Sequence, residues 1–270
     1  MLLVLAIFIA FVKINIQAEE KQNEEHSRSI FSYPYVVLGA LGIFFYVGAE
    51  VAVGSNIVSY LKESRQMPEA LAAAYLSYYW GGAMIGRFLG SVSLSNMSSG
   101  KKTASMVLLA TAGFAVIYVI NYLLHGLSFG QVVVFLAFMI INFLGFHLGK
   151  GMPSRLLAIF ALLNVVLICT AMLSSGTIAV WSLLAIGLFN SIMWSNVFTL
   201  AIDGLENRTA EASSILIMMI LGGAVLPPLQ GMLADAIGIR FSFIVPMISY
   251  IYLLYYGLAG YKVGKSKLSK

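Results

Sequence analysis

The sequence predicts an all-α protein that crosses a membrane many times. Of its 270 residues, 60% are hydrophobic and only 10% are charged, whereas an average soluble domain carries roughly 25% charged residues. The apolar residues form continuous runs of about 20, the length that a helix needs to cross a hydrocarbon core of about 30 Å. Strands of a membrane barrel would instead show alternating segments of about ten residues. The fold class is therefore a polytopic bundle of helices.

Eight of the apolar runs are long enough to span the membrane. They cover residues 35–61, 70–94, 104–124, 131–149, 155–173, 177–202, 211–234 and 241–261. The connections on one side are rich in basic residues, namely Lys13, Lys21, Arg28, Lys101, Lys102, Lys150, Arg155, Arg208, Lys262, Lys265, Lys267 and Lys270. The other side holds only Lys62, Arg65 and Arg240. The positive-inside rule therefore places the richer side in the cytoplasm.

Several functions are excluded by what the sequence lacks. The net charge of +5 does not indicate a nucleic-acid partner, because the basic residues are scattered at the ends of apolar runs. The single cysteine, Cys169, allows neither an internal disulfide nor a paired-cysteine metal motif. His147 has no second ligand at helical spacing, so we expect no metal site. Since no phosphate loop or nucleophile–base set is visible either, we expect no cofactor and no enzyme chemistry.

The two ends of the chain differ from the spans. Residues 1–13 are apolar up to Lys13 but cover only about 18 Å as a helix, so we interpret them as the end of a truncated transmembrane helix. A signal peptide is the competing interpretation. Residues 14–34 include the polar stretch QAEEKQNEEHSRS and predict a cytoplasmic interdomain linker. Residues 263–270 predict a basic cytoplasmic tail.

Four stretches together resemble a known family. They are YVGAEVAVGSNIVSYL (46–61), YYWGGAMIGRFLGS (78–91), LFNSIMWSNVFTLAIDGL (188–205) and ASSILIMMILGGAVLPPLQGMLAD (212–235). In this order they are similar to the C-terminal half of the fucose/glucose/galactose permeases, which are sugar:cation symporters of the major facilitator superfamily. The stretches cover about a quarter of the chain and include unusual strings such as GGAVLPPLQG.

The resemblance implies two six-helix halves that are joined by a cytoplasmic linker and bind substrate between them near mid-membrane. Residues 1–13 would then end the sixth helix, and residues 35–262 would form the C-terminal transporter bundle, with about eight full transmembrane helices plus the partial one. Two spans exceed the family pattern, and we interpret about 104–149 as a helical hairpin inserted between the eighth and ninth helices.

The implied function is secondary active transport of a sugar by alternating access, in symport with H⁺ or Na⁺. The sugar would be a hexose such as glucose or galactose, or fucose, and the location the bacterial cytoplasmic membrane. The chain would then be a fragment that needs the N-terminal half as its partner, and we expect no transport by this chain alone. The alternative is a membrane-embedded non-transporting sensor, or a membrane enzyme, that uses the same bundle.

Glu50 is the first candidate site residue. It lies within an apolar run, 44–61, whose nearest basic residue is Lys62. A charge at the bilayer centre costs at least about 2.5 kcal/mol, so the carboxyl must face protein or a water-filled cavity. At about 100° per residue, one face of this helix carries Gly39, Tyr46, Glu50 and Gly54. We predict that Glu50 and Tyr46 bind substrate or couple the cation; a structural acid that hydrogen-bonds a neighbouring helix is the alternative.

Three further spans carry candidate sugar ligands. In 177–202, Asn190 and Trp194 share a stripe, and an amide beside an indole suits a sugar with polar edges and C–H faces. A packing stripe with one satisfied amide is the alternative. Asn56 points away from the Glu50 face, so it predicts a helix contact or a rim contact. Gln230 could line the outer vestibule.

Candidate gating and hinge residues lie in two spans. Arg87, towards the cytoplasmic end of GGAMIGRFLG, resembles the cytoplasmic gating motif of the superfamily, and a topological anchor is the alternative; Asp203 and Glu206 are its candidate partners. The glycines of that stretch predict a flat face for close helix approach. A mid-membrane hinge, or a static kink, is predicted at Gly222, Gly223, Pro227 and Pro228.

Overall fold

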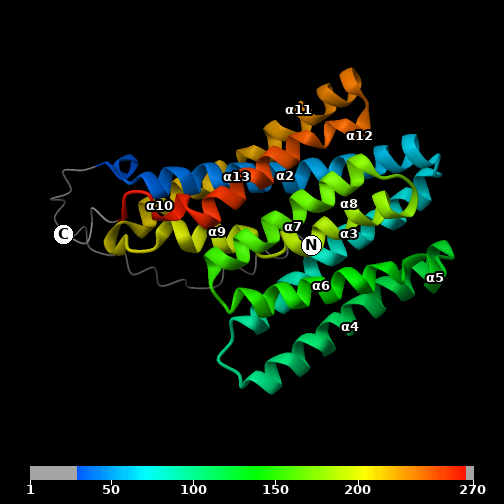
Figure 1. Ribbon diagram of the computed structural model, residues 1–270, viewed down its shortest axis with the longest axis horizontal. Helices are drawn as coiled ribbons and strands as arrows, with labels where there is room; N and C mark the ends of the chain where they lie inside the picture. The colour runs from blue at the N-terminus through cyan, green and yellow to red at the C-terminus, as the bar shows by residue number, and fades with distance from the viewer. Residues whose placement is uncertain (1–28, 266–270) are drawn as a thin grey trace, which may run out of the picture.

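The computed structural model describes residues 29–265, and this part of the chain is helical without any strand. Its helices run roughly side by side (Figure 1). Their bounds are α2 (Pro34–Arg65), α3 (Glu69–Ser93), α4 (Ser99–His125), α5 (Phe129–Val132), α6 (Val134–Gly149), α7 (Pro153–Leu173), α8 (Gly176–Asn190), α9 (Met193–Ile202), α10 (Thr209–Met218), α11 (Gly222–Ile237), α12 (Ile239–Ser242) and α13 (Ile244–Leu258). Short 3₁₀ turns are η1 (Ile30–Ser32), η2 (Glu206–Arg208), η3 (Met219–Leu221) and η4 (Gly260–Lys262). The predicted partial helix 1–13, most of the linker 14–34 and most of the tail 263–270 lie outside the described residues.

Each of the eight predicted spans coincides with a helical segment, either one helix or two helices joined end to end. Within residues 29–265, seven segments are long and apolar enough to cross a membrane. The eighth, α3, has 25 residues, and its tyrosines, glycines and serines lower its hydropathy. The protein is therefore an integral membrane protein, and within residues 29–265 hydropathy locates every predicted span except α3.

Helix ends are set by local backbone chemistry. Pro34 occupies the first turn of α2, where a missing N–H costs nothing. The same helix ends at Gln66, which takes a left-handed conformation with φ 50°. The α4 helix ends likewise at Gly126, with φ 68°. Because the connections are short, successive spans run antiparallel, and the two ends of the bundle differ in charge.

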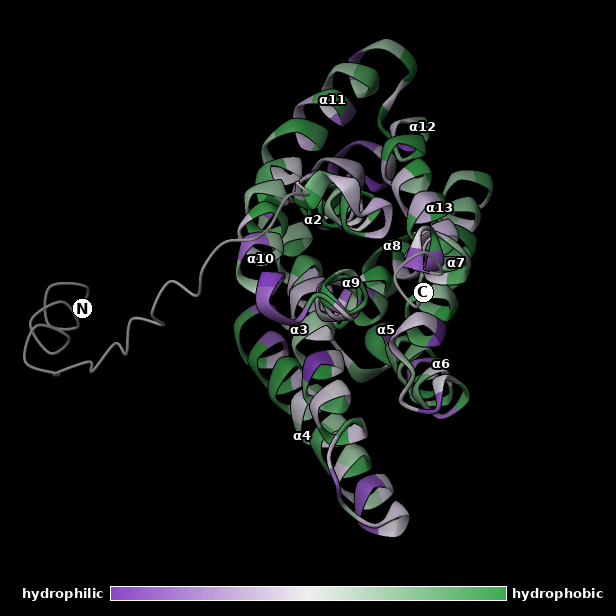
Figure 2. Ribbon diagram, turned by 90° about the vertical axis from the view of Figure 1, so that its left-hand side faces the viewer, coloured by the Kyte–Doolittle hydropathy of each residue, from purple (hydrophilic) through white to green (hydrophobic). Residues whose placement is uncertain are grey.

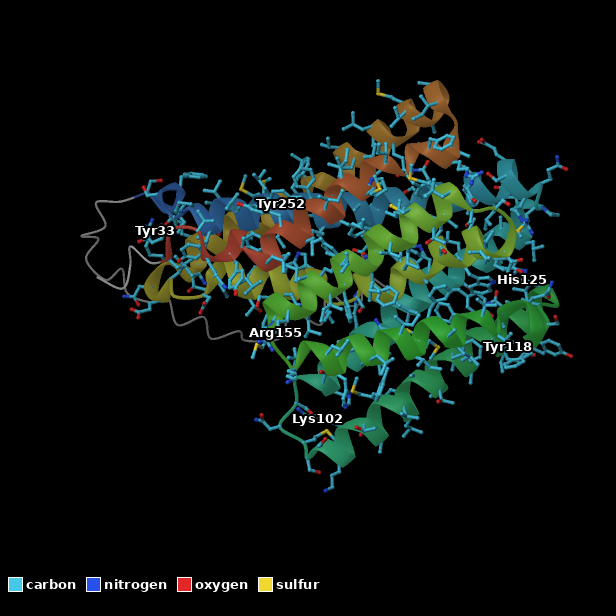
Figure 3. All side chains as sticks on the ribbon, in the orientation of Figure 1. Tyr33, Lys102, Tyr118, His125, Arg155 and Tyr252 are labelled. Atoms are coloured by element: carbon cyan, nitrogen blue, oxygen red, sulfur yellow. The ribbon has the colours of Figure 1, made fainter. Side chains whose placement is uncertain are left out.

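The charge difference between the two ends agrees with the predicted orientation. The basic residues of the predicted cytoplasmic side that the structure describes lie where α4, α7 and α10 begin or where α6 and α13 end. Lys102 and Arg155 lie at this end, with Tyr33, whereas His125 and Tyr118 lie at the other (Figure 3).

The α2 helix is the centre of the bundle and packs against α11, α13, α9 and α3. Two contacts bring helix backbones together. A side chain at Gly222 would collide with the Phe44 carbonyl group, and one at Gly187 with the Tyr79 carbonyl group. Small residues at such points allow the close approach that stabilises helix pairs in a membrane.

The α4 helix lies at the edge of the bundle. Only 17% of its most apolar stretch is buried, against 83% for the corresponding stretch of the α8–α9 segment. The helix projects away from the other helices (Figure 2). The amide of Asn121 donates to the Ser77 hydroxyl at 2.8 Å, and that of Asn142 on α6 donates to the Leu188 carbonyl at 3.1 Å. These bonds attach α4 and α6 to α3 and α8. That the pair is an insertion relative to the family stays a prediction.

Candidate functional site

An ion pair joins the centre of α2 to the C-terminal part of α3. Arg87 Nη2 lies 3.2 Å from Glu50 Oε1, and the two side chains are 55% and 11% exposed. One turn before Glu50, Tyr46 lies on the same face of α2 and lines the same cavity as Glu50. A carboxylate at this depth needs a compensating partner, because desolvation would otherwise make its charge costly. The basic partner that the local sequence lacks is supplied by the neighbouring helix.

The expected partners of Arg87 were wrong. We predicted that Arg87 pairs with Asp203 or Glu206, but Asp203 forms an ion pair with Lys265, with 2.7 Å between Oδ2 and Nζ. Arg87 lies on the face of α3 that packs against α2, so its guanidinium reaches Glu50 rather than the loop after α9. Arg87 lies towards the cytoplasmic end of α3, as predicted, but its side chain pairs with the carboxyl of Glu50.

The ion pair opens onto a cavity of about 600 Å³. Its walls are Tyr46, Val47, Glu50, Arg87, Gly90, Ser91, Leu94, Ser191, Ile192, Trp194, Ser195 and Ile220. The Trp194 ring stacks on Phe198 at 4.9 Å between centroids. The cavity thus combines a charged pair, serine side chains and an indole, which are the groups that bind the edges and C–H faces of a polyhydroxylated molecule.

The helix that carries Trp194 is broken beside the cavity. The α8 helix ends at Asn190 and α9 begins at Met193, with Ile192 at φ −118° and ψ 4° between them. Gly86 and Gly90 of α3 leave room for the break, because side chains there would collide with Ser191 and Ile192. This confirms the predicted close-packing face. At the break, the Leu188 carbonyl oxygen accepts a hydrogen bond from the Asn142 side-chain amide. This carbonyl group therefore has a hydrogen-bond partner within the membrane, where water is absent.

Asn190 lies behind the cavity wall and is fully buried. Its amide nitrogen donates to the Tyr79 hydroxyl at 3.0 Å, and that hydroxyl donates to the Glu50 carbonyl oxygen at 2.8 Å. Its amide oxygen accepts from Asn164 Nδ2 at 2.9 Å and from the Tyr250 hydroxyl at 2.8 Å. This hydrogen-bond network, which we call the Asn190 network, joins five helices and holds the backbone of the Glu50 turn.

Replacing Asn190 by alanine is expected to destabilise the bundle. Asn164 and Tyr250 would lose their acceptor and Tyr79 its donor, and each buried group left unpaired costs about 1–3 kcal/mol. Thermal unfolding of the purified chain in detergent measures the effect. The matched control is Asn56→Ala, since the Asn56 amide bonds only to Ala52 of its own helix. Equal melting temperatures for the two variants would contradict a structural role for the Asn190 network.

The sequence of the chain is similar to those of known transporters. No protein-family model matches the chain. Over 263 residues the chain is 36% identical to a glucose/galactose transporter of Brucella abortus, a match that covers 96% of this chain and 51% of that protein. It is 33% identical over 265 residues to a putative glucose/galactose transporter of Helicobacter pylori, covering 96% of this chain and 52% of that protein. The chain thus spans about half the length of the curated relatives it matches.

Solved structures decide the fold. The crystal structure of FucP, a major facilitator superfamily transporter in the outward conformation, matches 94% of this chain with a TM-score of 0.61 at 22% identity, over 51% of its own length. A second structure, of the E. coli fucose:proton symporter FucP, matches with a TM-score of 0.59 at 21% identity. The chain has the fold of the C-terminal half of a major facilitator superfamily transporter.

Not all predicted site residues line the cavity. Tyr46, Glu50, Arg87 and Trp194 do. Gln230 is fully buried and donates from Nε2 to the Ser242 hydroxyl at 3.3 Å. It therefore lies between α11 and α12 rather than on the cavity wall.

The predicted hinge residues occupy a single helical segment. The 3₁₀ turn η3 (Met219–Leu221) interrupts the α-helix directly before Gly222 and Gly223. Pro227 and Pro228 lie inside α11, and their rings exclude hydrogen bonds to the carbonyls of the first α11 turn. Ile220 of η3 lines the cavity, so this irregularity borders the site as well. A hinge role for these residues stays a prediction.

Sequence reasoning missed several residues that support the cavity. Asn164 carries the same signal as Asn190, an amide inside an apolar span, and could have been found on that ground. Tyr79 and Tyr250 gave no distinct signal, because tyrosine is common throughout these helices. Ser91 lies beyond Arg87 on the cavity wall and was not singled out.

Proposed function

We infer that this C-terminal half belongs to a secondary active transporter that moves a sugar together with a cation by alternating access. The observation that carries the inference is the Glu50–Arg87 pair on the wall of a cavity that also offers an indole and serine side chains. The names of the relatives support a hexose such as glucose or galactose, or fucose, as the sugar. The cation is H⁺ or Na⁺, and the membrane is the bacterial inner membrane.

The ion pair provides a physical basis for coupling. A carboxyl that is paired with Arg87 has its charge compensated within the protein, whereas a bound cation supplies that compensation itself. Binding of H⁺ or Na⁺ at Glu50 therefore frees the guanidinium, which donates to sugar hydroxyls in the same cavity. Since both ligands change one pair, each alters the affinity for the other.

Two helix irregularities border the cavity and support movement of its walls. The α8–α9 break contributes Ser191 and Ile192 to the cavity wall, and η3 contributes Ile220. Broken helices at membrane depth are common where transporters bind substrate, because two rigid segments can rock about the break. We propose that these are the joints of alternating access, with a second six-helix bundle closing the cavity.

Transport is expected to require that second bundle. The chain alone, reconstituted in liposomes, should show no saturable uptake of labelled glucose, galactose or fucose, because half of the cavity wall is then lipid or solvent. A fusion behind the first six-helix bundle of the Brucella abortus relative should show saturable uptake of at least one of these sugars. Saturable uptake by the chain alone would contradict the shared cavity, and sugar binding by the fusion without uptake would favour a non-transporting sensor.

A further inference from the structure

A second cavity, which shares no lining residue with the first, lies at the predicted cytoplasmic end of the bundle. It measures about 180 Å³ and lies where α3 and α6 end and α4 begins. Its walls are Ser93, Ser99, Lys102, Thr103, Met106, Phe146, His147, Lys150 and Gly151. Figure 3 marks its position through Lys102, with Arg155 nearby at the same end. We call this cavity the α4–α6 cleft.

The cleft is cationic without an internal counter-charge. Residues 70–202 contain no aspartate or glutamate, but they include Lys101, Lys102, Lys150 and Arg155. Of the salt bridges found between residues 29 and 265, none involves Lys102 or Lys150. Lys102 Nζ donates only to the Ser93 carbonyl oxygen, at 3.0 Å. Two ammonium groups thus face one small space, and an anion from outside the chain would satisfy both.

The start of α4 adds further donors. This 27-residue helix has no acidic residue in its first turn, and its N-cap residue Ser98 makes no side-chain capping bond. The first N–H groups of a helix have no partner within the helix, and the helix dipole favours negative charge beside them. Ser99 and Thr103 of this first part of α4 line the cleft. Ammonium groups, hydroxyls and free N–H groups together form a typical environment for a phosphate group.

Apolar surface surrounds these polar groups. Met106 and Phe146 are buried in the cleft wall, only 3% and 2% exposed. On the outer faces of α4 and α6, at the same end, Leu108 and Leu148 are exposed. A ligand that places a phosphate in the cleft can therefore lay a hydrocarbon chain along exposed leucines, which a free phosphate ion cannot do. The site also joins α4, the least buried helix, to the rest of the bundle.

We propose that the α4–α6 cleft binds the phosphate headgroup of an anionic phospholipid of the cytoplasmic leaflet, such as phosphatidylglycerol. Basic pockets between transmembrane helices on this side bind such headgroups, and each lysine near the membrane surface strengthens attraction to anionic lipid. The lipid fixes α4 and α6 against α3 at their cytoplasmic ends. The site involves no residue of the sugar cavity, so the lipid proposal can be tested independently of the proposed transport function.

Equilibrium binding of fluorescent phosphatidylglycerol to the purified full chain in detergent tests the proposal. The double variant Lys102→Gln/Lys150→Gln is expected to bind roughly 30-fold more weakly, from the contribution of two lysines near the surface. The control Lys101→Gln/Lys262→Gln removes the same charge from exposed lysines outside the cleft and should bind nearly as the unchanged chain does. The charge-conserving variant Lys102→Arg/Lys150→Arg should retain binding, which shows that loss does not come from misfolding.

Competition separates the lipid from other sources of phosphate. Unlabelled phosphatidylglycerol should displace the probe, whereas phosphatidylcholine and inorganic phosphate at the same concentration should not. Equal weakening of lipid binding by the two double variants, Lys102→Gln/Lys150→Gln and Lys101→Gln/Lys262→Gln, would overturn the proposal. It would show a general attraction of the lipid to the basic end of the protein. Displacement by inorganic phosphate as effective as that by the lipid would also overturn it.

Discussion

Replacing Glu50 by glutamine is expected to abolish concentrative sugar uptake while sugar exchange continues. Glutamine keeps the shape of the side chain but has no charge to pair with Arg87 or to attract a cation, and it takes up no proton. We expect the initial rate of uptake against a gradient to fall at least about tenfold, equivalent to about 1.4 kcal/mol of lost interaction. Counterflow, which needs sugar binding and the conformational change but no net cation movement, should persist. Both are measured with labelled sugar in liposomes containing the fused transporter described above.

The control for this prediction lies on the same helix. Glu63 is exposed near the outer end of α2 and forms no salt bridge within the described chain, so Glu63→Gln makes the same chemical change away from the cavity. It should leave both uptake and counterflow unchanged. If Glu50→Gln behaved like Glu63→Gln in both assays, Glu50 would only brace α2 against α3.

Replacing Gly222 by alanine is expected to weaken assembly of the bundle strongly. The added Cβ would overlap the Phe44 carbonyl group, which is backbone and cannot rotate away. The α2 and α11 helices would have to separate along their contact, and overpacking typically costs about 1–3 kcal/mol. A lower melting temperature of the purified chain in detergent, with a lower yield of folded protein, is the expected result.

The same helix provides the comparison. A Cβ at Gly231 of α11 would meet nothing within 4 Å, so Gly231→Ala adds the same methyl group without a collision. It should leave stability unchanged or raise it slightly, because alanine favours helix over glycine. Equal melting temperatures for the two variants would show that α2 and α11 do not approach as closely as the structure indicates.

The spans were predictable because a membrane helix is encoded by length and apolarity, which are local properties of the sequence. The α8–α9 break was not predicted. No proline marks Ser191 or Ile192, and the polar residues beside them, Asn190 and Ser195, do not by themselves signal a break. Room for the break comes from Gly86 and Gly90 on another helix, so the cause is tertiary and invisible to local pattern.

The positions of site residues were predictable only where they follow from the geometry of a single helix. Tyr46 and Glu50 line the cavity together because residues four apart share a helix face. The pairing of Glu50 with Arg87 depends on which helices are neighbours and on the depth of each residue in the membrane. Hydropathy does not determine which helices are neighbours or how their residues align. Asn190 and Trp194 were placed on one stripe, but the break between them turns Trp194 to the cavity and leaves Asn190 among Tyr79, Asn164 and Tyr250.

The central claim is that a cation and a sugar meet at the Glu50–Arg87 cavity, and cation movement on addition of sugar tests it most directly. Liposomes containing the fused transporter are equilibrated without gradients, a transported sugar is added outside, and internal pH and Na⁺ are followed with dyes. The account predicts that sugar drives H⁺ or Na⁺ inward, with no such flux in the Glu50→Gln protein. Sugar entry without movement of either cation, or an undiminished cation flux in Glu50→Gln, would contradict it.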